Sequence, residues 1–381
     1  MRQSMPFLLA LFLLAYSLGW AADSTDQASQ DQQAALCTSD HIAGDQAQQT
    51  DTEATCSTDN PSVQFTATDF LSAAVNSGLT TELPPLLNRN HQSKDSANAD
   101  THMSAGETYG PLNIWGAIGW RSLDNDFVST TYNSTANSMM AGADLQPLDP
   151  LVIGIAVGIE NNDVSTVFNS GSQEILSLTG LGYLGYLVGD TVSVDFVLGT
   201  SSVDIDQDRT LSPFGAAAGP FAGVAAGTSI VSEVNAARYF AAMNVNGFWT
   251  LNDWRIGANA GYLQAYESRD AFTESGGGVT NGIAGSNSNL AQLRVGGDVS
   301  YSIKAFEPYL GLDYYNDINR DDVVVSAAQA QPSNDNDEIV LSTGFRYFSP
   351  GGMATSLEYT KSFTRDDIDS NSLSIILSTE W

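Results

Sequence analysis

Basic residues and histidines are scarce in this sequence. Lysine and arginine together number 14 against 44 aspartates and glutamates, which gives a formal net charge of -30. A chain this acidic repels phosphate backbones, so nucleic acid is excluded as a partner. The three histidines, His41, His91 and His102, all lie before residue 110. The rest of the chain therefore has no histidine to act as a base beside a serine or an aspartate, and we predict no enzymatic activity.

Motifs for cofactors and metals are missing as well. The Gly-rich stretch "SGGGVTNGIAG" at 275–285 joins two expected strands and opens no helix, so it is neither a dinucleotide-binding nor a P-loop motif. The paired aspartates at 321–322 and 366–367 lack the spacing of an EF-hand and are typical of solvated loops. We predict no catalytic site, no cofactor site and no metal site.

Only one long apolar run is present, at 7–18, and it is too short to span a bilayer comfortably. Arg2 precedes it, and the small residues Gly19 and Ala21 follow, which is typical of a signal peptide cleaved after Ala21. We therefore expect residues 1–21 to direct export. No later stretch is long and apolar enough for a transmembrane helix, so a membrane could be crossed only by strands.

Cysteine is limited to Cys37 and Cys56. In an exported protein two such residues can form a disulfide that closes a small loop, and we predict this pairing as a staple in a flexible segment. A metal-binding role is not supported, because no further Cys or His lies at ligand spacing.

The segment 22–109 is rich in Asp, Gln, Ser, Thr and Ala, with 13 acidic and 2 basic side chains. Such a composition buries too little apolar surface to fold alone, so we expect the segment to be largely disordered. One short helix is predicted at 68–78, with Thr68 as its N-cap and Gly78 after its end. Its apolar side either docks to hide from water or belongs to a plug or a pore-threading element.

From residue 110 onward, apolar and small or polar residues alternate. In "LVIGIAVGIE" (151–160) Leu151, Ile153, Ile155, Val157 and Ile159 occupy one face, and the other face carries mostly small residues. The same period of two recurs in "TVSVDFVLGT" (191–200) and "LAQLRVGGDVSYS" (290–302). The pattern predicts about twelve strands, near 111–121, 134–147, 151–161, 174–189, 191–203, 233–250, 254–267, 288–303, 308–317, 337–348, 353–363 and 371–381.

The connections between these strands alternate strictly between short and long. The five short ones are "QPLDPL", "VGDT", "TLNDW", "KAFEP" and "SPGGM", and the six long ones lie near 122–133, 162–173, 204–232, 268–287, 318–336 and 364–370. An even number of strands with short turns at one end and long loops at the other is typical of outer-membrane barrels. A secreted soluble β-sandwich or solenoid would also alternate, but it has no reason to sort its connections by length.

We therefore predict an all-β fold: a transmembrane, antiparallel, up-and-down β-barrel at 110–381, in contact with outer-membrane lipid. Charged residues on the polar faces are expected to line a wet lumen; they are Asp195, Arg255, Arg294, Asp298, Asp313, Arg346 and Glu358. Aromatic residues near strand ends are expected to form interfacial girdles; they are Trp115, Trp120, Trp249, Trp254, Tyr309, Tyr347, Phe348 and Trp381. For the long connection 204–232 three options stay open: folding into the mouth, contact with lipid or another cell surface, or an additional hairpin.

The region 110–381 resembles the translocator β-domain of type V secreted autotransporters. The resemblance rests on the strand count, the first strand "NIWGAIGWRS", the hairpin at 134–160 and the alternating end "SNSLSIILSTEW" with its terminal Trp381. It implies a 12-stranded barrel in the outer membrane of a Gram-negative bacterium, folded by the barrel-assembly machinery after handling by periplasmic chaperones. It also implies that the last strand carries the assembly signal, here Leu373, Ile375, Leu377 and Trp381. Trp381 could also serve simply as an interfacial anchor.

The departure from the family lies upstream, because only the short segment 22–109 precedes the barrel and "SKDSANADTHMSAGETYG" just before strand one makes a poor helix. Three functions remain open. The barrel translocates or displays its own N-terminal segment, as an adhesin or surface antigen with an unknown surface ligand. Alternatively, it is a porin-like channel whose N-terminal segment stays in the periplasm or the lumen, or it is a plain membrane anchor.

Overall fold

The computed structural model describes residues 112–126, 131–148, 150–167, 170–189, 191–217, 219–320, 336–349 and 353–380. All of them belong to the second of two compact units of the chain, Ser57–Trp381. Several predicted features lie outside the described residues: the signal peptide at 1–21, the pair Cys37 and Cys56, the helix at 68–78, and Trp381.

The described residues form fourteen strands and one five-residue helix. They are β1 (Leu112–Asn125), β2 (Tyr132–Leu148), β3 (Leu151–Thr166), β4 (Gly171–Val188), β5 (Val192–Thr210), α5 (Pro213–Ala217), β6 (Ser229–Leu251), β7 (Trp254–Arg269), β8 (Phe272–Gly276), β9 (Val279–Ile283), β10 (Ser286–Tyr301), β11 (Phe306–Arg320), β12 (Asp337–Phe348), β13 (Met353–Phe363) and β14 (Ile368–Glu380). No helix in this part of the chain is long and apolar enough to cross a membrane.

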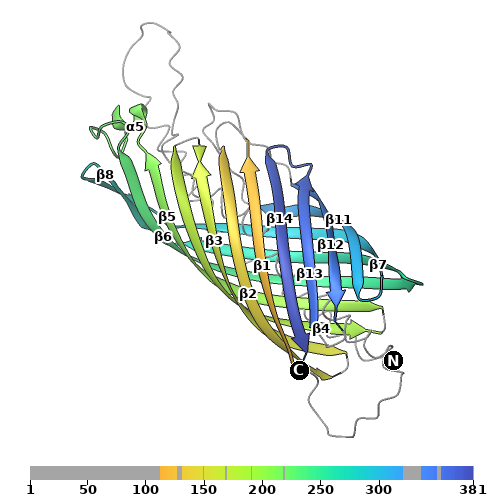
Figure 1. Cartoon of the computed structure of the whole chain (residues 1–381). Helices are drawn as coiled ribbons and strands as arrows, with labels where there is room; N and C mark the ends of the chain where they lie inside the picture. The colour runs from red at the N-terminus through yellow and green to blue at the C-terminus, as the bar shows by residue number, and fades with distance from the viewer. Residues whose placement is uncertain are drawn as a thin grey trace. The chain divides into compact units, whose positions relative to one another are not determined.

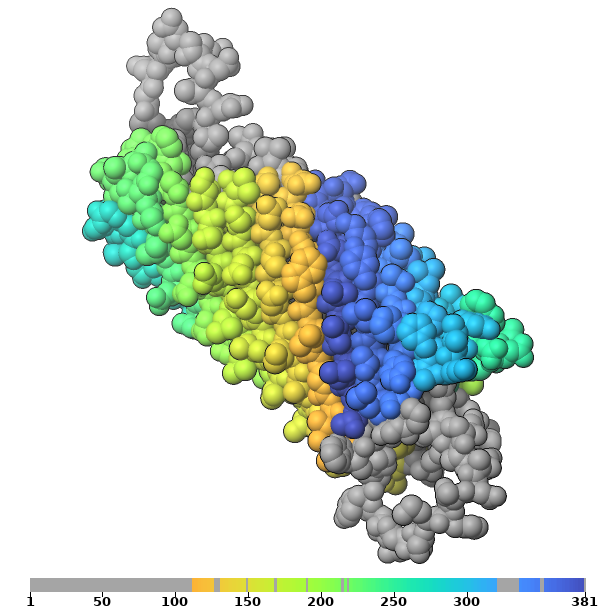
Figure 2. All heavy atoms as spheres, in the orientation of Figure 1, coloured from red at the N-terminus to blue at the C-terminus, as the bar shows by residue number. Residues whose placement is uncertain are grey.

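Twelve of these strands close into a barrel (Figure 1). Each strand pairs antiparallel with its neighbour, β10 pairs directly with β7, and the ring closes where β1 pairs with β14, with Ile118 opposite Ile375. On the surface, β1 lies directly against β14 (Figure 2). The predicted fold class and strand number are confirmed. The remaining strands, β8 and β9, form a hairpin beyond the ring, so the additional hairpin arises in the connection 268–287 and not in 204–232.

The outer face of the barrel is apolar over a band of about membrane height. On β3, Ile155 is 71% exposed on the outer face, whereas its neighbours Gly154 and Ala156 point inward and are buried. The outward residues stay apolar from Leu151 to Ile159 and become polar at Asn161. A transmembrane β-strand needs about 9–11 residues, so this band matches the hydrocarbon layer.

Above this band the two faces of the strands exchange polarity: the outer face becomes polar and the inner face becomes apolar. On β5, Phe196 and Leu198 point outward within the band, but Val203 and Ile205 point inward beyond it, while Asp204 is exposed on the outer face. At this height the outer face meets water and not lipid. Polar residues are therefore found on the outer face, and apolar residues on the inner face. The connections near 122–133, 162–173 and 204–232 were predicted as loops. The strands extend into all three connections, which are therefore shorter than predicted. β1 ends at Asn125 and β2 begins at Tyr132, β3 ends at Thr166 and β4 begins at Gly171, and β5 ends at Thr210 and β6 begins at Ser229.

The barrel wall is tallest at β5 and β6, which both extend far beyond the apolar band (Figure 1). The connection between them carries α5 and packs a small apolar core of Leu211, Phe221, Val224 and Ile230. Arg209 on β5 donates two hydrogen bonds, of 3.0 and 3.1 Å, to Glu274 on β8. This ion pair ties the β8–β9 hairpin to the tall wall, so the rim bears one folded projection on one side.

Inward glycines lie opposite bulky side chains on the neighbouring strand. Gly199 is paired with Phe240, and a Cβ built on Gly199 would lie 2.1 Å from the Phe240 ring. Gly142 and Trp115 form a second pair of this kind, with 2.5 Å between such a Cβ and the indole. The absence of a Cβ at each glycine therefore leaves the space that the aromatic ring on the neighbouring strand occupies.

The aromatic girdle is smaller than predicted. Trp249 and Trp254 flank the turn between β6 and β7 on the outer face, and Trp120 and Tyr347 are also exposed outward. Trp115 and Tyr309 are not part of a girdle, because both face the lumen and are buried. Their polar atoms explain this position, since each makes a hydrogen bond to an inner side chain.

Candidate functional site: the lumen of the barrel

The inner face of the barrel carries many charged side chains. Asp195, Arg294, Asp313 and Glu358 are buried and face inward, and the three other residues expected in the lumen, Arg255, Asp298 and Arg346, fall on the same inner face in a half-buried state. All seven come from strands on one side of the ring, from β5 through β7 and β10 to β13.

At the end of the barrel with short turns, these residues join a network with inner amides and phenols. Asn246 donates a hydrogen bond of 2.6 Å to Asp195, and Asn259 donates one of 3.0 Å to Asp313. The Tyr309 hydroxyl donates to Glu358 at 2.8 Å. Hydrogen-bonded partners of this kind satisfy polar groups that would be costly to bury alone.

Arg346 illustrates how an inner cation is held. Its Nη1 lies 3.0 Å from Glu307 Oε1, and its guanidinium sits 4.2 Å from the centre of the Tyr309 ring. An ion pair and a cation–π contact together fix the planar group against the wall.

At the end with long loops, a second set of charges was missed in the sequence. Glu267 on β7 accepts hydrogen bonds from Arg238 on β6 at 2.8 Å and from Arg269 at 2.9 Å, and its side chain is only 1% exposed. The alternation along the strand could have predicted this position. Glu267 and Arg255 are an even number of residues apart on β7, so both side chains face inward. The predicted strand ended at 267, and no inner role was given to its last residue.

A third charged group centres on Asp317 of β11. Its carboxylate accepts hydrogen bonds from Gln292 at 2.7 Å and from Arg365 at 2.6 Å, and Arg320 lies 3.3 Å away. The expected strand here stopped at 317, and Arg365 comes from the turn before β14, so no periodic pattern could bring the two together.

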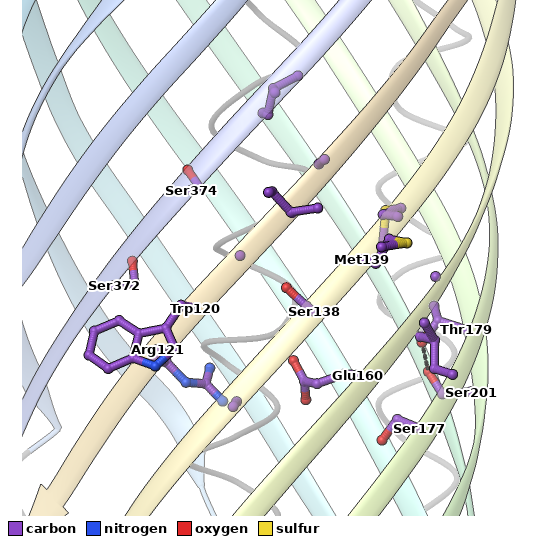
Figure 3. Close-up of a pocket in the computed structure, with 18 of the residues that line it drawn as sticks. Trp120, Arg121, Ser138, Met139, Glu160, Ser177, Thr179, Ser201, Ser372 and Ser374 are labelled. Atoms are coloured by element: carbon purple, nitrogen blue, oxygen red, sulfur yellow. Dashed lines mark hydrogen bonds between the residues drawn. The ribbon is translucent and has the colours of Figure 1, made fainter.

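The wall formed by β14 and β1 to β5 is lined by small residues near mid-height. A cavity of about 70 Å³ is lined by hydroxyl groups and by three charged side chains (Figure 3). The hydroxyls belong to Ser138, Ser177, Thr179, Ser201, Ser372 and Ser374, and the charged residues are Arg121, Glu160 and Arg238. Thr179 and Ser201 are hydrogen-bonded to each other at 2.7 Å. Since an α-helix is about 10 Å wide, the cavity is too small for a polypeptide unless inner side chains move.

Above the cavity, the same wall becomes apolar inside. We call this group the mouth cluster: Leu123, Tyr132, Val164, Ile175, Val203, Ile205, Val234 and Ala236, with Phe272 and Ile368 packed against it. Although these residues lie on the inner face, Tyr132 is only 1% exposed and the buried members are all nearly inaccessible. They pack against one another and against Phe272 and Ile368, so the inner face of this wall is apolar at this level.

Metal binding finds no support among the described residues, where no three His, Cys, Asp or Glu side chains are grouped closely enough to hold an ion. The three histidines lie outside the described part of the chain.

A closed twelve-stranded barrel with charged residues inside matches a known family. The family model described as the autotransporter β-domain matches residues 114–360, which is more than half of the chain. The chain belongs to the autotransporter β-domain family. As an autotransporter β-domain, its barrel is an outer-membrane translocator, as the sequence resemblance predicted.

Solved autotransporter barrels share the fold. The translocator domain of NalP from Neisseria meningitidis superposes with a TM-score of 0.60 at 10% identity, over 81% of this chain and 98% of that chain. The β-domain of the Bordetella autotransporter BrkA gives a TM-score of 0.56 at 14% identity, over 71% of this chain and all of the other. No curated protein sequence matches the chain. At such low identities the likeness extends to the fold alone.

The predicted assembly signal lies at the seam of the ring. Leu373 and Leu377 are exposed on the outer face of β14, Ile375 shares that face, and Trp381 is outside the described residues. The one exception to the alternation, Ile376, points inward and is buried beside the small-residue wall.

Proposed function

We propose that this autotransporter barrel carries its own N-terminal segment, residues 22–109, across the outer membrane of a Gram-negative bacterium and displays it at the cell surface. In this proposal the signal peptide 1–21 directs export, and the displayed segment acts as an adhesin or surface antigen. The family of the barrel supports translocation, and the acidic, polar composition of 22–109 suits a chain that crosses unfolded.

The direction of the first strand carries the proposal. Leu112, at the start of β1, pairs with Leu145, close to the short turn between β2 and β3. Short turns of outer-membrane barrels face the periplasm. The segment before β1 thus enters the barrel wall from the periplasmic end, so it can reach the outside only through the lumen.

The small-residue wall offers the path for this passage. Small inward residues on β14 and β1 to β5, serines and glycines among them, line the 70 Å³ cavity. Hydroxyl groups can exchange hydrogen bonds with a passing backbone, and the charged residues Arg121, Glu160 and Arg238 line the same cavity. Above the cavity, a passing chain would meet the apolar inner face of the mouth cluster.

An epitope tag inserted next to Gln46 tests the proposal. We expect the tag to be labelled by antibody on intact cells and removed by added protease. A tag placed in the turn at 252–253 serves as the periplasmic control and must stay protected, and one at Gly223, in the projection on the tall wall, must be reached. If the tag at Gln46 is reached only after the outer membrane is permeabilised, export is refuted. A porin-like channel or an anchor then remains.

We further propose that Leu373, Ile375, Leu377 and Trp381 form the signal read by the barrel-assembly machinery, after periplasmic chaperones have delivered the chain. Replacing Trp381 by Ala should slow assembly in cells several-fold while leaving refolding in detergent unchanged. An equal loss in both settings would instead make Trp381 a plain interfacial anchor.

A further inference from the structure

We propose that the free edge of β9, at the end of the barrel with long loops, pairs with the same edge of a second copy of this chain on a facing cell. The contact joins cells through backbone hydrogen bonds between two strands. It depends only on this end of the barrel facing outward, and it is independent of whether residues 22–109 are exported.

Strand β9 lies at the edge of its sheet. Among the described residues it pairs with β8 on one side and with no strand on the other, whereas β8 also meets β6. Charged residues and prolines commonly protect an exposed edge from pairing with another chain. The stretch 275–287, which contains all of β9, has neither. The edge is protected only by its short length.

The turn between β8 and β9 determines which backbone groups face the free edge. Gly277 and Gly278 have φ values of 59° and 82°, as the two central residues of a type I′ turn require. The residues that flank such a turn, here Gly276 and Val279, form a hydrogen-bonded pair. Hydrogen-bonded and non-hydrogen-bonded pairs then alternate along the hairpin.

This alternation directs the N–H and C=O groups of Thr280 and Gly282 away from β8, toward the free edge. Both residues are exposed. The same alternation directs Ser275 of β8 toward β6, and Ser275 is the residue that pairs with Val231 there. The pairing on the β6 side therefore agrees with the assignment on the β9 side.

The hairpin is held firmly against the tall wall (Figure 1). Val279 packs against the small apolar core of the β5–β6 connection. Glu274 of β8 accepts two hydrogen bonds from Arg209 and one of 3.4 Å from Asn281 of β9. Because the edge is already ordered, adding a strand to it costs little further conformational entropy.

The edge is complementary to itself. If two β9 strands lie antiparallel with Asn281 opposite Asn281, Thr280 of each copy lies opposite Gly282 of the other. Each of these two pairs exchanges two backbone hydrogen bonds, which makes four in all. Val279 lies opposite Ile283 of the second copy, and β-branched residues are favourable cross-strand neighbours.

The antiparallel direction places the second copy in a facing membrane. β9 runs from the turn back toward β10 and the membrane, and every copy in one membrane has this same orientation. Their β9 strands therefore run in the same sense, and an antiparallel partner must come from the opposite side.

Charge favours this contact over others between two copies. The chain has a formal net charge of -30, so two copies repel each other, but the uncharged stretch 275–287 can approach its counterpart without opposing carboxylates. Four hydrogen bonds make a weak contact, and many copies on one surface act together to hold it.

Mixed lipid vesicles that carry the full-length protein test the proposal. Two vesicle populations with different dyes should cluster together, and Thr280→Pro or Gly282→Pro should lower this co-clustering at least about tenfold, because each removes an edge donor. Neither N–H points toward β8, and a Cβ at Gly282 meets nothing within 4 Å, so the hairpin is retained. The matched control Thr280→Val keeps the N–H and should cluster like the wild type.

A cross-link tests the register. Asn281→Cys should give disulfide-linked dimers between clustered vesicles under mild oxidation, above the level that the unchanged chain gives through Cys37 and Cys56. Thr273→Cys, on β8 of the same hairpin, should not exceed that level. Gel mobility before and after boiling confirms that each variant is folded.

Three results would each overturn the proposal. They are wild-type vesicles that do not cluster, a Thr280→Pro variant that clusters like Thr280→Val, and an Asn281→Cys variant that cross-links no more than Thr273→Cys. The tag at Gln46 reports export separately, so either proposal can fail without the other.

Discussion

Removing the carboxylate of Glu267 tests whether the inner ion pairs stabilise the barrel. Glu267 is the shared acceptor of Arg238 and Arg269, and all three side chains are at most 6% exposed. Glu267→Ala leaves two guanidinium groups close together, buried and without this counter-charge. Breaking a buried pair from one side typically costs about 3–5 kcal/mol, so we expect a loss in this range in the free energy of unfolding.

The comparison is with a pair at the surface. Lys361 and Asp369 form an ion pair that is 28% and 58% exposed, and exposed pairs contribute about 0–1 kcal/mol. Urea unfolding of the refolded barrel in lipid vesicles measures the loss of unfolding free energy for Glu267→Ala and for Lys361→Ala, which removes the surface pair. We also expect the triple variant Arg238→Met, Glu267→Leu and Arg269→Met to recover most of the loss, because it removes the charges together. If Glu267→Ala costs no more than Lys361→Ala, the inner ion pairs do not stabilise the barrel.

Three further predictions use the same unfolding assay. Gly199→Val should cost about 1–3 kcal/mol, because its side chain would enter the space of the Phe240 ring, whereas Gly180→Val on the outer face meets nothing within 4 Å and should be nearly neutral. Ile155→Arg should cost about 2–4 kcal/mol in vesicles if this residue lies in the hydrocarbon layer, and an unchanged stability would refute the assigned membrane band. Glu174→Gln should stabilise the barrel by up to about 1 kcal/mol, more at low salt, because its cross-strand neighbours on both sides are carboxylates; a destabilised variant would contradict this.

The barrel itself could be predicted from the sequence because lipid imposes a simple rule on each strand. Ile153, Ile155 and Val157 alternate with small inward residues, and any strand that crosses the membrane must repeat that pattern. The strand ends were harder. On β5 the apolar residues Val203 and Ile205 fall on the inner face, whereas the expected pattern has apolar residues on the outer face. The pattern therefore ends where the outer face passes from lipid to water, and the strand itself continues beyond that point.

The lumen could be predicted only in part. Parity within a strand assigns Asp195 or Arg294 to the inner face without a structure. Pairs between strands that are not direct neighbours depend on the tilt of the strands in the ring, which determines that Arg365 meets Asp317. Parity also assigns Trp115 to the inner face, because it is out of phase with the outward Ile114 and Ile118 on β1. Its partners there, Gly142 on β2 and the hydroxyl of Tyr183 on β4, could not be predicted from the sequence.

The reversal of the apolar face along β3 also fixes how deep the strand sits. A slip of one residue would expose Val164 to water and at the same time turn Ile155 away from lipid, so the error is penalised at both ends of the strand. A slip of two residues keeps both faces correct but draws Asn161 down to the level of the acyl chains or lifts Ile159 above them. The reversal of polarity therefore specifies how deep β3 lies in the membrane, and β5 carries the same reversal.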